Sequence, residues 1–217
     1  MFMSFENLWL CRCIPEENRR IDEFIKDGVI GIGWTKLGDM SHKSKSLIRD
    51  EINQVGYGTS NVTVGVFNHF VNNMQIGDIC LIPDENKIYI AKIEGNYFYD
   101  KTKLVLKFPH IRKVTFLNAD KPLDRYDLPE DLQKSLGARN TVADLTHRKD
   151  LFINYMNNVI DDTIGNTISD KNNMQNELLS MLPKALQNIK NDLESDDATR
   201  REIASIEVIK LIQSFQE

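Results

Sequence analysis

The first 150 residues alternate between short apolar stretches and short amphipathic stretches. Apolar and β-branched residues predict strands at 6–13, 29–34, 77–83, 87–95 and 110–117. Apolar residues spaced by three or four predict helices at 16–28, 43–55, 62–74 and 129–137. Only Asp84-Glu85-Asn86 separates two of the strands, which predicts an antiparallel hairpin. Short strands with brief connections favour a small, largely antiparallel β-barrel with peripheral helices.

The pattern changes near residue 148, after which apolar residues recur only at helical spacing. One apolar stripe near the end consists of Ile203, Ile206, Ile209, Ile212 and Phe215. Acidic residues after Ser195 predict a helix start there, and Pro183 is expected to kink or restart the helix that contains it. We therefore predict an α+β protein with a barrel domain at 1–147 and an all-helical module at 148–217.

The composition is that of an ordinary globular protein, with 217 residues, 41% hydrophobic and 27% charged. No apolar run approaches the ~20 residues that span a bilayer, and the amino terminus lacks the features of a secretory signal. These features predict a cytoplasmic protein without a membrane partner. Cys11, Cys13 and Cys80 fit neither a disulfide framework nor a zinc pair, so we expect buried thiols.

Charge is unevenly distributed along the chain. Residues 1–150 hold 21 basic and 21 acidic side chains, whereas residues 151–217 hold 6 and 11, so the helical module carries the whole net charge of −5. Within the neutral part, residues 87–113 hold seven basic and two acidic side chains, interleaved with aromatic rings. Such a mixture suits a nucleic-acid surface, where cations meet phosphates and rings stack on bases. A sheet with a solvated lysine face and a buried aromatic face has the same composition.

The sequence contains no recognisable catalytic constellation. Glu85-Asn86-Lys87 has the spacing of a metal-dependent nuclease motif, but a single hairpin turn cannot direct both Asp84 and Glu85 at one cation. The four histidines have no ligand spacing, and Gly31-Ile32-Gly33-Trp34 lacks the third glycine of a dinucleotide fingerprint. We therefore predict a protein without a metal, a cofactor or an enzymatic reaction.

Aromatic and glycine residues gather at the ends of predicted strands. Gly31 and Gly33 permit close approach of a ligand or of another backbone segment, and Trp34 follows them at a strand end. Tyr97 and Tyr99 share a face if extended, and so do His110 and Arg112 on the next strand. A cage of Trp34, one tyrosine and a polar group has the chemistry needed to hold a flipped base. Taken singly, each of these residues is more often structural.

An ordered string of short motifs resembles the PUA-like domain at the amino terminus of many Mrr-type restriction endonucleases, a relative of the EVE and YTH readers. The motifs are Trp9-x-x-Arg12, Gly31-Ile32-Gly33-Trp34 with Gly38-Asp39-Met40-Ser41, Phe70-x-x-x-Met74-x-x-Gly77-Asp78, Ile93-x-Gly95-x-Tyr97-x-Tyr99, His110-x-Arg112-x-Val114, and Ser135-Leu136-Gly137 to Thr141-Val142. The resemblance covers residues 6 to about 145. It implies a PUA-like barrel whose pocket accepts a modified cytosine or adenine, extruded from DNA or presented by RNA.

Two departures from that family matter. Phe116 stands where the family usually has a tryptophan, and residues 148–217 are too short and too helical for the Mrr nuclease domain. Any cleavage of nucleic acid must therefore come from a separate effector. The helical module is expected to form a homodimer or to recruit that effector, in defence against foreign DNA.

These observations assign provisional roles to named residues. Trp34, beside Gly33, is expected to stack on the base; Tyr97 or Tyr99 closes the cage; Asp39 or His110 reads the polar edge. The residues expected to contact phosphates of the nucleic acid are Lys101, Lys103, Lys107, Arg112 and Lys113. Two alternatives remain open: a small hydrolase acting on a modified nucleoside in the same pocket, and a protein-interaction or antitoxin-like module whose helices carry the function.

Overall fold

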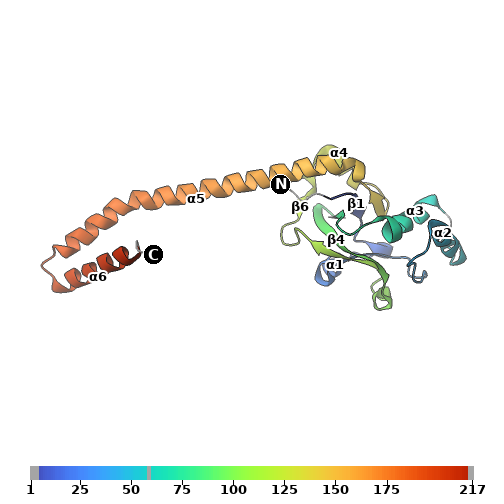
Figure 1. Ribbon diagram of the computed structural model, residues 1–217, viewed down its shortest axis with the longest axis horizontal. Coiled ribbons are helices and arrows are strands. Elements are labelled where there is room, and N and C mark those ends of the chain that lie inside the picture. Colours follow the sequence, from blue (N-terminus) through green and yellow to red (C-terminus); the bar gives the residue numbers. More distant parts are fainter. Residues whose placement is uncertain (1–4, 58–59, 215–217) are drawn as a thin grey trace. The chain divides into compact units, whose positions relative to one another are not determined.

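The computed structural model describes residues 5–57 and 60–214, with side chains in the last two helices described at 149–160, 180, 181, 183–210 and 213 (Figure 1). The chain divides into two compact units, Met1–Asn158 and Val159–Glu217. A long helix begins at Lys149, just after the predicted boundary, and the two compact units divide within this helix, between Asn158 and Val159.

The first unit combines seven strands with short helices. The strands are β1 (Leu8–Cys11), β2 (Val29–Ile32), β3 (Ile79–Asp84), β4 (Lys87–Tyr99), β5 (His110–Phe116), β6 (Leu123–Asp124) and β7 (Val142–Asp144). The α-helices of the chain are α1 (Ile21–Asp27), α2 (Lys45–Gln54), α3 (Asn61–Asn68), α4 (Glu130–Leu136), α5 (Lys149–Leu193) and α6 (Ala198–Ser214). Shorter helical turns are η1 (Pro15–Glu17), η2 (His69–Asn73), η3 (Lys101–Leu104), η4 (Arg125–Asp127) and η5 (Thr146–Arg148).

The strands form one mixed sheet in the order β2-β5-β4-β3-β1-β7, with β6 paired to β4. Neighbouring strands are antiparallel except β1 and β3, which are parallel. The predicted hairpin of β3 and β4 is confirmed, and so is the α+β class. Among the described residues no pairing joins β2 to β7, so the sheet is open rather than a closed barrel.

Strict alternation of side chains gives the sheet two buried faces. On β1, Trp9 and Cys11 join a first cluster with α1, α2 and α3, while Leu8 and Leu10 join a second cluster. The second cluster is covered by α4 and by the first turns of α5, where Phe152 is fully buried. Both edge strands, β2 and β7, place residues in the first cluster, so the sheet bends around it.

Local sequence signals explain the helices that flank the first cluster. The Ser44 and Ser60 side chains accept hydrogen bonds from Leu47 N (3.4 Å) and Thr63 N (3.1 Å) and so cap α2 and α3. Gly28 ends α1 in the left-handed conformation, as its position predicts. The segment predicted as one helix at 62–74 is confirmed, although its last part, η2, is π-helical.

The second unit consists of helix only. A kink or a restart was predicted at Pro183; helix α5 continues through this residue, so it does not restart there. The chain reverses direction before α6 (Figure 1). The predicted helix start is confirmed, because Asp197 Oδ1 accepts a hydrogen bond from Thr199 N at 2.8 Å. The side chains of Ile212 and Phe215 lie outside the described residues. No described helix contains a stretch long and apolar enough to cross a membrane.

Candidate functional site

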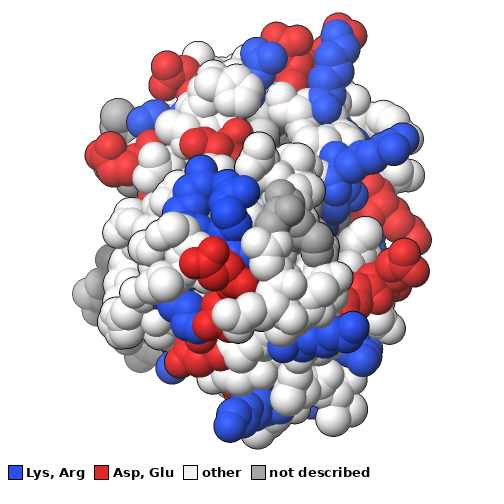
Figure 2. All heavy atoms as spheres, turned by 90° about the vertical axis from the view of Figure 1, so that its right-hand side faces the viewer, with Lys and Arg blue, Asp and Glu red and all other residues white. Residues whose placement is uncertain are grey.

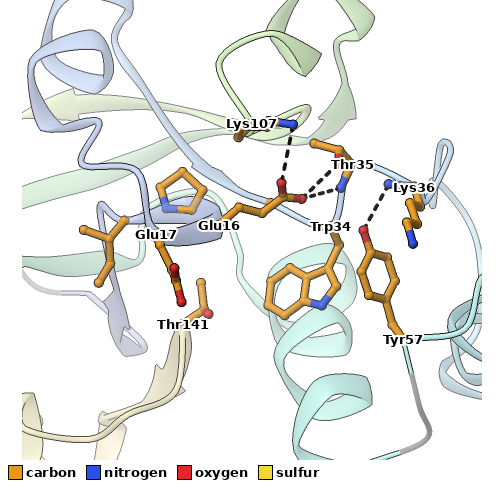
Figure 3. A pocket seen from close by; sticks show the side chains of 11 residues that line it. Glu16, Glu17, Trp34, Thr35, Lys36, Tyr57, Lys107 and Thr141 are labelled. Atoms are coloured by element: carbon orange, nitrogen blue, oxygen red, sulfur yellow. Dashed lines mark hydrogen bonds and ion pairs between the residues drawn. The ribbon is translucent and has the colours of Figure 1, made fainter.

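A pocket of about 560 Å³ opens where loops from both edges of the sheet meet; we call it the Trp34 pocket (Figure 3). It is lined by Ile14, Pro15, Glu16, Glu17, Gly33, Trp34, Thr35, Lys36, Tyr57, Lys107 and Thr141. Gly33 and Trp34 follow β2, one edge strand, whereas Thr141 immediately precedes β7, the other edge strand. The bend of the sheet around the first cluster therefore creates this pocket.

Unusual backbone conformations concentrate around the Trp34 pocket. Six non-glycine residues of the described chain have positive φ, and four of them line it: Glu16 (45°), Glu17 (65°), Trp34 (61°) and Lys107 (68°). A left-handed backbone is unfavourable for bulky side chains and persists only where the surroundings enforce it. Such strain clusters at binding and active sites, which singles out this pocket as the candidate site.

The Trp34 ring has one face in the core and another at the pocket. It packs edge-to-face on Phe67, with ring centroids 5.0 Å apart, and remains half-buried. Figure 3 shows the indole between Tyr57 on one side and Glu17 and Thr141 on the other, with no hydrogen bond from the indole N–H to the residues drawn. The indole therefore lies at the pocket with its N–H free of the residues drawn, and its predicted stacking on a base stays a prediction.

Hydrogen bonds hold the segment that follows Trp34. The Thr35 amide and hydroxyl both donate to Glu16 Oε1, at 2.9 and 3.0 Å, and Lys107 Nζ lies 3.9 Å from Glu16 Oε2. The Lys36 amide donates to Tyr57 Oη at 3.2 Å, which places the tyrosine ring against the pocket (Figure 3). The carboxylate of Glu16 is therefore engaged in structure, whereas that of Glu17 faces the pocket without such partners in the figure.

The two glycines before Trp34 allow parts of this chain, rather than a ligand, to approach closely. A Cβ on Gly33 would lie 2.8 Å from Glu16 Cγ and 3.3 Å from the Lys107 carbonyl oxygen. A Cβ on Gly31 would lie 2.8 Å from the Phe108 ring. The missing side chain at 33 is what brings η1 and the segment before β5 together at the pocket.

Tyr97, Tyr99 and His110 come together as predicted, but in a layer behind the pocket. The His110 ring is completely buried, stacks on Tyr97, and packs edge-to-face on Phe67, the residue that supports Trp34. The Tyr99 ring lies against the His110 ring, with the ring centroids 5.2 Å apart. Neither tyrosine lines the Trp34 pocket, whose second aromatic wall is Tyr57.

This layer fixes the loop that carries Trp34. Tyr97 Oη accepts a hydrogen bond from Met40 N at 3.1 Å and is joined to His110 Nδ1 at 2.8 Å. Burial lowers the pKa of His110 to about 4, although the Trp34 carbonyl and Asp39 favour the charged ring, and burial raises the pKa of Tyr97. Both side chains are therefore neutral near pH 7 and act by positioning.

Asp39 lies at the surface, outside the residues that line the Trp34 pocket. Its carboxylate accepts hydrogen bonds from Ser41 N (2.9 Å) and Ser41 Oγ (2.7 Å). Burial raises the pKa of Asp39, but these two hydrogen bonds outweigh burial, and the pKa falls below its ordinary value. Asp39 stabilises the turn after Trp34, which leaves Glu17 and Thr141 as the polar groups beside the ring.

The five residues assigned to phosphates occupy different environments. Lys107 lines the pocket, and Lys101 and Lys113 are exposed. Lys103 is paired with Asp27 at 2.5 Å and lies over the Phe108 ring. Arg112 is only 2% exposed and donates to backbone carbonyls, so it does not share the exposed surface of Lys101 and Lys113.

Charge on the side of the domain that carries α2 and α3 is mixed. Figure 2 shows Lys and Arg side chains interspersed with Asp and Glu, with white surface between them. A broad basic face is not visible in this view, so any nucleic-acid contact there must depend on a few placed cations.

The cysteines are buried thiols, as predicted. Burial raises the pKa of Cys13 to about 12, with Asp84 acting in the same direction, so this thiol is protonated near neutral pH. In the described part of the chain, no three His, Cys, Asp or Glu side chains are grouped so as to hold a metal ion.

The family described as a domain of unknown function, DUF8426, matches residues 10–146, more than half of the chain. The chain belongs to the DUF8426 family. Every residue that lines the Trp34 pocket falls within the DUF8426 range, whereas helices α5 and α6 both lie beyond it.

Comparison of the DUF8426 chain with curated proteins gives no match. Among solved structures, the crystal structure of protein Atu2648 from Agrobacterium tumefaciens is 17% identical, covers 68% of this chain and 92% of its own, and has a TM-score of 0.34.

Several pocket residues of the DUF8426 domain were not predicted from sequence. Glu16 and Glu17 lie in the short turn η1, and Tyr57 and Thr141 lie in loops; no periodic pattern in these segments marks the side that faces a cavity. The sequence predicted that Pro15 and the two acidic residues after it begin one helix. In the structure they form the short turn η1, and the helix α1 begins separately at Ile21. The turn η1 lies near Trp34 because the sheet bends. No local sequence pattern predicts that bend.

Proposed function

We propose that the DUF8426 domain is a non-catalytic reader that binds a modified nucleobase in the Trp34 pocket, and that its bent, open sheet is a variant of the PUA-like fold. The observation that carries this proposal is the left-handed Trp34, held on Phe67 with its ring at a pocket of about 560 Å³ opposite Tyr57. Two aromatic side chains offer the stacking surface that a flat base requires, and stacking contributes about 1 to 3 kcal/mol per base.

The polar groups around the rings suit the edge of a base. The Glu17 carboxylate accepts hydrogen bonds, as from an amino group of cytosine or adenine, and the Thr141 hydroxyl can donate or accept. Lys36 and Lys107 at the same pocket can meet the adjoining phosphates. In this proposal, Tyr97, Tyr99, His110 and Asp39 position the Trp34 loop instead of touching the base.

The proposal extends to the rest of the chain. We propose a cytoplasmic protein, acting in defence against foreign DNA, whose acidic helical module associates with a second copy or with a separate effector. Ile203, Ile206 and Ile209 on α6 are about half exposed, at 54%, 47% and 55%, which supports an apolar contact there.

A small hydrolase acting on a modified nucleoside is the second candidate. The Glu17 carboxylate at the pocket favours it, because a carboxylate can act as a general base. Product release from a modified nucleoside, lost in Glu17→Gln with binding retained, would establish this function in place of the reader.

Replacing Trp34 with Ala is expected to weaken binding of a modified oligonucleotide by about 1 to 3 kcal/mol, because the stacking surface is removed. Trp34→Phe should retain part of the affinity, and Tyr57→Ala should lose affinity in the same range. Fluorescence anisotropy with a labelled oligonucleotide at fixed salt measures the change, on variants shown to be folded.

The matched control for the Trp34 variants is Tyr126→Ala, since Tyr126 is 69% exposed and lies outside the pocket. That substitution should leave affinity unchanged. Equal affinity of the Trp34→Ala variant and the original chain would show that the pocket does not hold the base.

Replacing Lys101, Lys107 and Lys113 together with neutral residues is expected to weaken the binding of modified and unmodified oligonucleotides alike. Each lysine that no longer meets a phosphate should reduce the slope of log affinity against log salt by about 0.7 to 0.9. Affinity at several salt concentrations measures this slope, with Lys121→Gln as the control. An unchanged slope in the triple variant would mean that other cations meet the phosphates.

Self-association through α6 is expected to depend on its exposed isoleucines. Replacing Ile203, Ile206 and Ile209 with Gln removes apolar surface without changing charge, so the variant should run as a monomer where the original chain forms a dimer. Sedimentation velocity across micromolar concentrations measures the oligomeric state of the original chain and of the variant. A monomeric original chain at all these concentrations would exclude self-association.

A further inference from the structure

A second cavity, of about 320 Å³, is independent of the Trp34 pocket; we call it the Arg112 pocket. It is lined by Ser41, His42, Val71, Asn72, Met74, Gln75, Asn96, Tyr97 and Arg112. Arg112 is the one arginine or lysine in this lining, and its side chain is buried, with 2% of the residue exposed. The lining contains no carboxylate. The cavity therefore combines a buried cation with amide and imidazole side chains.

The Arg112 guanidinium is held in place by three backbone carbonyls and lies over the Phe70 ring, 6.0 Å from its centroid. Its Nε donates to the Phe70 carbonyl (2.6 Å), and its two terminal nitrogens donate to those of Gly95 and Val71 (both 3.1 Å). Phe70 and Val71 belong to the π-helical turn η2, whose carbonyls thereby gain donors. These hydrogen bonds fix the plane and the direction of the guanidinium.

Among the described residues, the charge of Arg112 has an aromatic contact with Phe70 but no carboxylate partner. None of the ion pairs found among the described residues includes it, and buried Asp78 acts on it only at longer range. A guanidinium has five N–H donors, and three are used by the carbonyls, so each terminal nitrogen keeps one N–H. A buried cation without an anion is costly, which makes the cavity beside it favourable for one.

We propose that the Arg112 pocket binds a small oxyanion, a carboxylate or a phosphate group, on the guanidinium of Arg112. A planar fork of N–H groups matches two oxygens of such a group. Asn96 and His42 at the rim add donors, and His42 has positive φ (61°). The ligand is either a free anion or a phosphate of a bound nucleic acid.

The test uses the full chain and the variant Asn96→Asp, which puts a carboxylate into the cavity without disturbing the carbonyl partners of Arg112. Asn53→Asp, at an exposed position of α2, is the matched control for added charge. The unfolding temperature is measured against inorganic phosphate, acetate and a short oligonucleotide, each at constant ionic strength. A ligand that binds only the folded state raises this temperature.

At least one of the three anions is expected to raise the unfolding temperature of the original chain and of Asn53→Asp. The apparent affinity of Asn96→Asp for that anion should be at least about ten-fold weaker than that of the original chain. Stabilisation by phosphate or acetate identifies a free anion as the ligand, and stabilisation by the oligonucleotide alone identifies a nucleic-acid phosphate. The same dependence in Asn96→Asp as in the original chain, or no stabilisation by any of the three, would overturn the proposal. Phosphate and acetate have no base to stack on Trp34, and the oligonucleotide is judged only by the difference between Asn96→Asp and Asn53→Asp, so failure here is distinguishable from failure of base reading.

Discussion

Replacing Asp78 with Ala is expected to lower the free energy of unfolding by about 3 to 5 kcal/mol. The Asp78 carboxylate is 1% exposed and accepts hydrogen bonds from Trp9 Nε1 (2.7 Å), Gln75 N (2.9 Å), and Asn7 through its amide N (3.2 Å) and Nδ2 (3.0 Å). Each buried donor that loses its acceptor costs about 1 to 3 kcal/mol. Asp78 thus joins β1 to the segment before β3, next to the parallel pairing of these strands.

Urea unfolding followed by tryptophan fluorescence measures this loss, because both tryptophans, Trp9 and Trp34, lie in the first unit. Asp78→Asn keeps one carbonyl oxygen and should lose less. Asp120→Ala, at an exposed position, is the control and should be neutral. A loss below about 1 kcal/mol for Asp78→Ala would contradict the structural role of this carboxylate.

His110 is expected to make the domain less stable as the pH falls from 7 to 5. Burial lowers its pKa from 6.5 to about 4 in the folded chain, so the unfolded chain binds the proton first. The stabilisation is fully present above pH 6.5 and is lost between pH 6.5 and pH 4, which amounts to about 2 kcal/mol between pH 7 and pH 5.

The His110 contribution is measured as the difference between the original chain and His110→Gln in unfolding free energy at each pH. Burial also lowers the pKa of His69, so part of the pH dependence should remain in the variant. Parallel pH profiles for the two proteins would show that His110 does not titrate with a lowered pKa.

Much of the fold could be predicted because the elements that form it have strong local patterns. The short Asp84-Glu85-Asn86 connection between β3 and β4 indicated a hairpin, and Gly28 indicated the end of α1. The short strands β6 and β7 were not predicted, since two or three residues hold too little pattern. The parallel pairing of β1 with β3 joins segments about 70 residues apart in sequence, beyond the reach of any local signal.

The candidate site was only partly predictable for a related reason. Trp34 stood out beside two glycines, and the structure places it at a pocket. Tyr57 reaches that pocket from a loop and Glu17 from the turn η1, and the placement of both segments depends on the bend of the sheet. Arg112 was grouped with surface cations on composition, but carbonyls of the π-helical turn η2 bury it.

The most direct test of base reading is the affinity of the full chain for a panel of oligonucleotides that differ only in one modified cytosine or adenine. Measurements at about 150 mM salt keep exposed charges screened, so that the base dominates the differences. At least one modified oligonucleotide is expected to bind about ten-fold or more tightly than its unmodified counterpart, with the preference abolished in Trp34→Ala. Equal affinity across the panel, or a preference that survives in Trp34→Ala, would contradict the account.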